Sequence, residues 1–217
     1  ALVSTREQLH YAHSEARRRG LDGTVHFRLG SFYQCRGRFD RILASGFLER
    51  YPEPAYGVLF ERLQALLHDD GLAWLQVSGR NCDADLSNHW HQQQLPGRHS
   101  LPLLSDLSRA LEHTRLRALL MEDQSEYRLQ DLRNQAQRYR RKRPAISQRF
   151  GESRTRHWEF LLASQITALQ WGQLRQLELI LGNARCRWPA VVSDSRLSAD
   201  ELPVDMAYRI TGLARDI

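Results

Sequence analysis

Residues 39–46 read FDRILASG and residues 72–78 read LAWLQVS, and both stretches have the composition of strands buried in a sheet. Between them, residues 54–67 place leucines at helical spacing, and Asp69-Asp70-Gly71 supplies a turn before the second strand. A strand, a helix and a strand joined by short turns favour a parallel pair with a helical crossover. We therefore expect a mainly parallel sheet with helices on both faces, which binds its ligands at the carboxyl ends of the strands.

The pattern continues on both sides of this unit. Residues 5–19 form an amphipathic helical pattern and residues 24–30 alternate like a strand, whereas residues 82–100 are polar and predict a loop or lid. Further helices are predicted at 103–112, 127–143 and 154–170, and further strands at 115–121 and 177–181. The expected division is a domain over 1–183, with lid and substrate-side segments at 82–114 and 127–172, and a C-terminal extension at 184–217.

The composition excludes several classes of protein. With 217 residues, 41% of them hydrophobic and 26% charged, the chain suits one globular domain with a core, and no apolar run is long enough to cross a bilayer. No secretory leader pattern is visible at its start. Cys35, Cys82 and Cys186 lie far apart, so we expect free thiols in a reducing compartment. The His/Gln run at 89–94 lacks Cys or carboxylate partners, so a polar lid is expected there and no metal site.

The formal net charge of +6 comes mainly from arginine, and the run RYRRKR at residues 138–143 is its strongest concentration. Three interpretations stay open. The run is a solvated helix end, where cations interact favourably with the helix dipole, or it docks on an anionic membrane. Nucleic-acid binding is the least expected of the three, because interleaved aromatic residues and a binding module are lacking.

Several segments, in their order and spacing, carry a family resemblance. They are residues 3–8 (VSTREQ), 39–49 (FDRILASGFLE) and 70–81 (DGLAWLQVSGRN), then Trp90, Leu95-Pro96 and Leu101-Pro102, and finally Met121-Glu-Asp123 with Tyr127. Over residues 3–183 the chain resembles the cyclopropane-fatty-acyl-phospholipid synthase family of S-adenosylmethionine-dependent methyltransferases. The resemblance implies a Rossmann-like methyltransferase sheet with a helical lid insertion.

The resemblance also implies a reaction and its residues. The family transfers a methyl or methylene group from S-adenosylmethionine to an alkene in a lipid acyl chain, with a bound bicarbonate as base. Glu49 and Tyr127 match the family's glutamate and tyrosine, Gln76 stands in place of a histidine, and Gln165 stands in place of a cysteine on the late helix. These four are the expected catalytic residues. Glutamine does not titrate, so no proton relay can run through Gln76.

For the cofactor, the resemblance implies contacts near the ends of three strands. Ser31 stands where the family has an acidic residue beside the adenine. The glycine-rich turn that follows the family's first strand is not found in the sequence, so we expect upstream residues, or another polypeptide in a homo- or hetero-oligomer, to supply the missing strand. The expected cofactor-binding residues are Val3, Thr5, Gln8, Ser31, Phe32 and Ser45.

Two functional hypotheses remain. The first is a divergent S-adenosylmethionine-dependent methyltransferase that acts on lipid acyl chains, in the cytoplasm or at the periphery of the inner membrane, with lipid as its partner. The second is a non-catalytic homologue that binds or stabilises a partner protein. The replacements at Ser31, Gln76 and Gln165 favour the second hypothesis, so whether the chain is an enzyme stays open at this stage.

Overall fold

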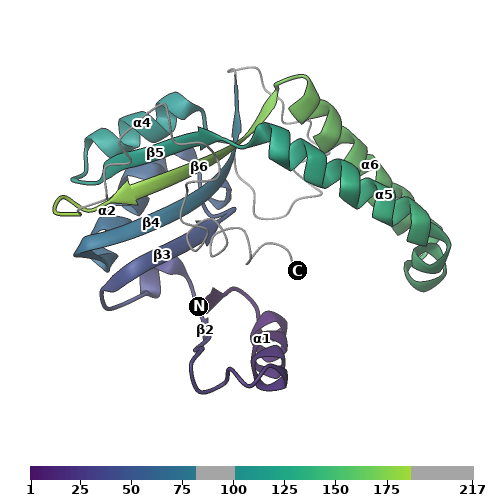
Figure 1. The fold of residues 1–217 in the computed structure, drawn as a ribbon, viewed down its shortest axis with the longest axis horizontal. Helices are drawn as coiled ribbons and strands as arrows, with labels where there is room; N and C mark the ends of the chain where they lie inside the picture. The colour runs from purple at the N-terminus through teal and green to yellow at the C-terminus, as the bar shows by residue number, and fades with distance from the viewer. Residues whose placement is uncertain (82–100, 187–217) are drawn as a thin grey trace, which may run out of the picture. The chain divides into compact units, whose positions relative to one another are not determined.

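The computed structural model describes residues 1–81 and 101–186, which belong to one compact unit, Ala1–Cys186. Its described strands form two sheets (Figure 1). The small sheet is a parallel pair, and the larger sheet has the strand order β3–β4–β6–β5. The strands are β1 (Leu2–Val3), β2 (Arg28–Leu29), β3 (Phe39–Ser45), β4 (Leu67–Arg80), β5 (Arg117–Asp123) and β6 (Leu174–Gly182).

The larger sheet confirms the expected α/β architecture, but it is mixed and not mainly parallel in its pairing, because β6 runs against both neighbours. β3 is parallel to β4, whereas β6 is antiparallel to both of its neighbours, β4 and β5. The carboxyl ends of β3, β4 and β5 therefore meet at one edge of the sheet, together with the amino end of β6. The strand predicted at 24–30 is shorter than expected, because β1 offers only Leu2 and Val3 for pairing with Arg28 and Leu29.

The hydrophobic core lies on one face of this sheet. Along β4, alternate side chains such as Leu75 and Val77 are buried, as the two-residue period of a strand requires. α2 (Tyr56–Leu66) and α4 (Leu104–Glu112) cover that face and contribute Phe60 and Leu107 to the core. Each fully buried side chain of this size contributes about 1.5–3 kcal/mol to folding, so this face holds most of the stability of the sheet.

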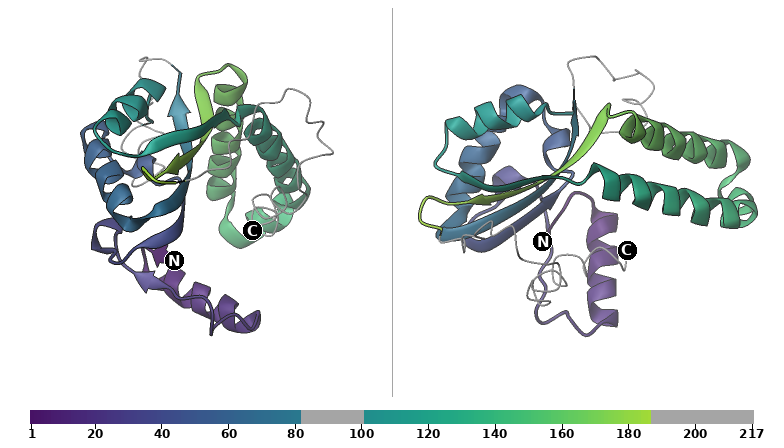
Figure 2. Two further views of the ribbon diagram at one scale, coloured as in Figure 1. Left: turned by 60° about the vertical axis from the view of Figure 1, so that its left-hand side comes forward. Right: turned by 45° about the horizontal axis from the view of Figure 1, so that its top comes forward.

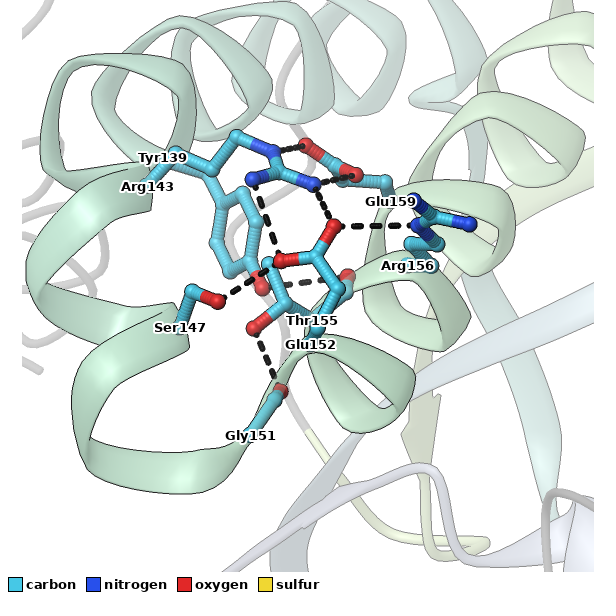
Figure 3. A network of polar contacts seen from close by, with 8 residues as sticks. All are labelled: Tyr139, Arg143, Ser147, Gly151, Glu152, Thr155, Arg156 and Glu159. Atoms are coloured by element: carbon cyan, nitrogen blue, oxygen red, sulfur yellow. Dashed lines mark hydrogen bonds and ion pairs between the residues drawn. The ribbon is translucent and has the colours of Figure 1, made fainter.

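Two long helices, α5 (Ser125–Phe150) and α6 (Glu152–Gln170), follow β5 and pack side by side (Figures 1 and 2). The prediction that the first of them ends near residue 143 is wrong, because α5 continues through Pro144 to Phe150. Proline removes one backbone hydrogen bond inside a helix. Ion pairs from Arg143 to Glu152 and Glu159 of α6 hold the two helices together at this level (Figure 3).

Three residues of α5 have the spacing of a heptad repeat along one face of the helix. Leu129, Leu132 and Tyr139 are spaced three and seven residues apart, and the two leucines are buried while the Tyr139 hydroxyl donates to the carbonyl of Thr155 at 3.2 Å. Such spacing keeps one stripe of a helix against its partner. In the described part of the chain, no helix has the length and the apolar character needed to cross a membrane.

Candidate functional site

A buried glutamate marks the carboxyl edge of the larger sheet. The pairing of β3 with β4 ends at Ser45, opposite Gln76, so the backbone N–H of Ser78 lies beyond the last paired residue of β3. A single 3-10 turn, Leu48–Arg50, follows β3 and brings Glu49 to this position. Glu49 is 1% exposed, and its Oε1 accepts a hydrogen bond from the Ser78 N–H at 2.6 Å. The sheet geometry thus explains why the carboxylate is held at this edge.

The second carboxylate oxygen of Glu49 has no partner. Among the described residues, no donor reaches its Oε2, which is buried. Leaving a buried charged oxygen without a donor costs more than leaving a neutral one, on the order of 1–3 kcal/mol or above. Protein cores avoid such atoms, and they are found where a ligand or a chemical step needs them. Glu49 therefore has the character of a functional residue, and it can accept one further hydrogen bond.

A row of polar side chains crosses the sheet beside this glutamate. The successive register positions on β3, β4, β6 and β5 are occupied by Ser45, Gln76, Glu178 and Glu122. The Ser45 hydroxyl donates to Gln76 Oε1 at 2.7 Å, and the side chains of Trp74 and Gln76 form hydrogen bonds with the Glu178 carboxylate. Burial raises the pKa of Glu178, and the nearby Glu122 raises it further. The row places at the same edge a carboxyl group whose pKa is raised above its ordinary value.

The next row of the sheet, on the same face, is apolar. One pleat away from the polar row, the successive register positions are occupied by Leu43, Trp74, Ile180 and Leu120. Leu43 is 67% exposed, so the described residues leave part of this row uncovered. An exposed apolar row on a sheet favours a further covering segment. It stays a prediction that upstream residues or another polypeptide complete the sheet.

The residues expected on the cofactor side include two that stabilise a helix. Thr5 is the N-cap of α1 (Arg6–Arg18), and its hydroxyl accepts from the Gln8 N–H at 3.2 Å. The Gln8 side chain in turn accepts from the backbone N–H groups of Ser4 and Thr5. This capping box satisfies the first turn of α1. The side-chain oxygens of Thr5 and Gln8 are therefore already hydrogen-bonded within their own helix.

Three segments that follow strands converge beside this cap. Arg50, after β3, donates from Nη1 to the hydroxyl of Ser4, after β1, at 3.0 Å. Phe32, after β2, packs edge-on against Phe47, with ring centroids 4.7 Å apart. The ends of β1, β2 and β3 are thus in contact through side chains, as is expected where an α/β sheet binds a nucleotide-like cofactor.

A test of the fit to S-adenosylmethionine gives a partial match. The rings of Phe32 and Phe47, with Tyr33 and Tyr51 beside them, form an aromatic cluster that suits the flat adenine. Ser31 provides no carboxylate beside the adenine, and its backbone N–H donates to Gln34 Oε1 at 3.0 Å. Among the described residues, the aromatic cluster offers ring surfaces for an adenine, and the acidic residue that the family has beside it is missing.

The structure brings some of the predicted site residues together and leaves others apart. Glu49, Gln76 and Ser45 lie at one edge, as predicted. Tyr127 is 75% exposed in the first turn of α5, and Gln165 lies on α6. Within the described segments, neither forms a hydrogen bond with the residues at the edge, so their catalytic roles stay predictions. The His/Gln run at 89–94 and Cys82 lie outside the described residues.

Sequence reasoning did not single out Glu178 or the aromatic cluster. The signal for Glu178 is its charge within an otherwise apolar strand, LELIL at residues 177–181. An acidic residue in a strand buried on one face points to the other face. Phe47 and Tyr51 flank Glu49 in the sequence, but the contact of Phe47 with Phe32 joins the segments that follow β3 and β2, which no local pattern predicts.

The chain is similar to known cyclopropane synthases in both sequence and structure. The family model of mycolic acid cyclopropane synthetases matches residues 2–178. A cyclopropane synthase structure from Mycobacterium tuberculosis matches with a TM-score of 0.71 at 15% identity, over 84% of this chain and 68% of that one. A search of curated protein sequences found no match.

Two further solved structures share the fold. Geranyl diphosphate C-methyltransferase from Streptomyces coelicolor, in complex with S-adenosyl-L-homocysteine, has a TM-score of 0.61 at 12% identity, over 84% of this chain and 62% of that one. Phosphoethanolamine N-methyltransferase 2 from Haemonchus contortus has a TM-score of 0.71 at 12% identity, over 84% of this chain and 42% of that one. At these identities the likeness establishes the class I methyltransferase fold.

Proposed function

The chain belongs to the mycolic acid cyclopropane synthetase family, and we propose that it functions in an S-adenosylmethionine-dependent methyltransferase that modifies an unsaturated lipid acyl chain. The family membership supports the cofactor and the lipid class of the substrate. The observation that carries the proposal is the buried Glu49, because its Oε2 lacks a donor at the edge where this fold binds its ligands.

The chemistry assigns separate tasks to the residues at this edge. The cofactor, when bound, supplies the electrophilic methyl group. Phe32 and Phe47, which pack against each other, would hold its adenine beside their rings. Glu49, held by the Ser78 N–H, uses Oε2 to accept the O–H of a protonated oxyanion such as bicarbonate. Glu49 itself is shielded from water, so its carboxylate interacts more strongly with a bound ligand than an exposed one would.

Glu178 provides a second acid–base group at the same edge. Burial raises the pKa of Glu178. A general base is most effective when its pKa lies near the working pH, so this shift is in the direction that favours the role. Gln76 cannot carry a proton, so its part is to orient the Glu178 carboxylate through their hydrogen bond. Glu178 can thus accept a proton that the histidine of the family pattern would otherwise handle.

The proposal is tested first by binding and then by turnover. Isothermal titration of the full-length protein with S-adenosylhomocysteine should show micromolar binding, and the Glu49→Gln variant should bind equally well because the aromatic cluster proposed to hold the adenine does not include Glu49. Transfer of labelled methyl groups to phospholipid with unsaturated chains should then fall by about 100-fold or more in that variant. A wild-type protein that does not bind the product would refute the methyltransferase proposal and would favour a non-catalytic homologue that binds a partner protein.

A further inference from the structure

The two long helices carry the whole net charge of the protein. Residues 125–170, which span α5 and α6, contain ten Arg and Lys residues and four Asp and Glu residues, a surplus of six positive charges. The formal net charge of all 217 residues is also +6, so the other residues balance to zero. A polyanion that approaches the protein is therefore attracted to this helical hairpin before any other part.

The acidic side chains of the hairpin near its turn are already paired. Arg143 contacts Glu152 at 2.6 Å and Glu159 at 2.8 Å, and Arg156 contacts Glu152 at 3.0 Å (Figure 3). The Ser147 hydroxyl also donates to Glu152, at 2.7 Å. These contacts hold α5 against α6, so Arg143 stabilises the hairpin and is not available to an external partner.

Four other cations form a stripe on the exposed side of α5. They are Arg138, Arg141, Lys142 and Arg149, whose spacing places them within one side of a helix. Tyr139 and Arg143, which contact α6, lie on the other side. All four cations of the stripe are exposed, and none forms an ion pair with a residue that the structure describes.

Exposed aromatic side chains accompany the stripe at the turn between the helices. Phe150, 49% exposed, ends α5, and the guanidinium of Arg149 lies 5.2 Å from the centre of its ring. Trp158, 45% exposed, lies two turns into α6. Cations beside exposed aromatic rings match the interface of a bilayer, where phosphates attract the cations and the rings enter the headgroup layer.

We propose that the stripe of Arg138, Arg141, Lys142 and Arg149, together with Phe150, docks the protein on an anionic lipid bilayer. This inference deepens the proposed function and rests on it, since an enzyme that modifies acyl chains has to reach them in a membrane. The docking step itself requires neither the cofactor nor Glu49. Clusters of four or more cations on one helix are sufficient for binding to anionic headgroups.

The test measures binding of the full-length protein to vesicles, without cofactor. Vesicles of phosphatidylcholine and phosphatidylglycerol in equal parts should bind the protein, and vesicles of phosphatidylcholine alone should not. Each cation near the surface contributes about fivefold to the partition coefficient. The variant R138Q/R141Q/K142Q/R149Q should therefore bind about 600-fold more weakly, and the remaining binding should fall further as salt is raised.

A matched control removes the same charge elsewhere. Arg17, Arg28, Arg115 and Arg117 are exposed and lie outside the hairpin, so R17Q/R28Q/R115Q/R117Q should keep most of the vesicle binding. Equal losses in the two variants would overturn the proposal, because the effect would then follow net charge alone. Tighter binding to duplex DNA or RNA than to the anionic vesicles would also overturn it. If the protein binds vesicles but does not bind S-adenosylhomocysteine, the docking proposal is supported and only the proposed methyl transfer is refuted.

Discussion

Replacing Glu49 by Gln should stabilise the protein while it destroys the activity. Gln keeps an oxygen that can accept the Ser78 N–H at 2.6 Å, but it removes a charge from a side chain that is 1% exposed. The buried carboxylate incurs a desolvation cost of several kcal/mol, against about 1.5–3 kcal/mol returned by one charge-assisted hydrogen bond. In the Gln variant, burial of the unpartnered NH2 group costs about 1–3 kcal/mol, and the hydrogen bond from the Ser78 N–H to the amide oxygen returns about 1 kcal/mol. The balance favours the Gln variant by about 1–2 kcal/mol.

Urea unfolding followed by circular dichroism measures this difference. The midpoint of the transition should rise in the Glu49→Gln variant with an unchanged slope, because the surface exposed on unfolding is the same. Glu49→Leu provides the matched comparison, since it removes the charge together with the acceptor of the Ser78 N–H and should gain less than Gln. A lower midpoint for the Gln variant would show that Glu49 stabilises the fold, and the argument from its unpartnered oxygen would fail.

Three further perturbations test other parts of the structure. Burial raises the pKa of Glu178 above its unfolded value of 4.5, so its contribution to stability is complete below that value and declines as pH rises through the folded pKa. Glu178→Gln should therefore gain stability at neutral pH and none in acid, and equal gains in urea unfolding at both would contradict this. Arg143, with Ser147 and Arg156, lowers the pKa of Glu152 from 4.5 to about 2. The contribution of the Glu152 carboxylate to stability is therefore present above pH 4.5 and is lost as the pH falls toward 2. Glu152→Gln should speed amide hydrogen exchange in α5 and α6 at neutral pH but not in strong acid, and unchanged exchange at neutral pH would argue against the clamp. A Cβ at Gly71 would lie 3.0 Å from the carbonyl oxygens of Phe39 and His68, so Gly71→Ala should cost about 1–3 kcal/mol, and an unaltered melting temperature would disprove this close packing.

Sequence patterns predicted the larger sheet well because its strands and helices are regular and locally encoded. The alternation in residues 72–78 and the helical spacing in residues 54–67 reappear as β4 and α2. The end of α5 could not be predicted in this way, because Pro144 is a local signal against helix and the contacts that outweigh it come from Glu152 and Glu159 on α6. Tertiary contacts there outweighed local propensity.

The candidate site was predictable only in part. Glu49 and Gln76 follow from sequence segments at the ends of two predicted strands. The hydrogen bond from the Ser78 N–H to Glu49 depends on the length by which β4 extends past β3, and the environment of Glu178 depends on the register between β4 and β6. Register is a property of paired strands, so a single sequence does not show it.

The link between β5 and β6 is far longer than the sheet requires. Two antiparallel neighbours can be joined by a turn of about two residues, yet residues 124–173 connect Asp123 to Leu174. The pairing of β5 with β6 therefore does not set the length of this connection. What ties the connection to the sheet is the contact of α5 and α6 with β6, including the hydrogen bond from the Gln176 N–H to the Ser125 hydroxyl. A longer or differently charged hairpin that keeps those contacts would leave the strand pairing unchanged.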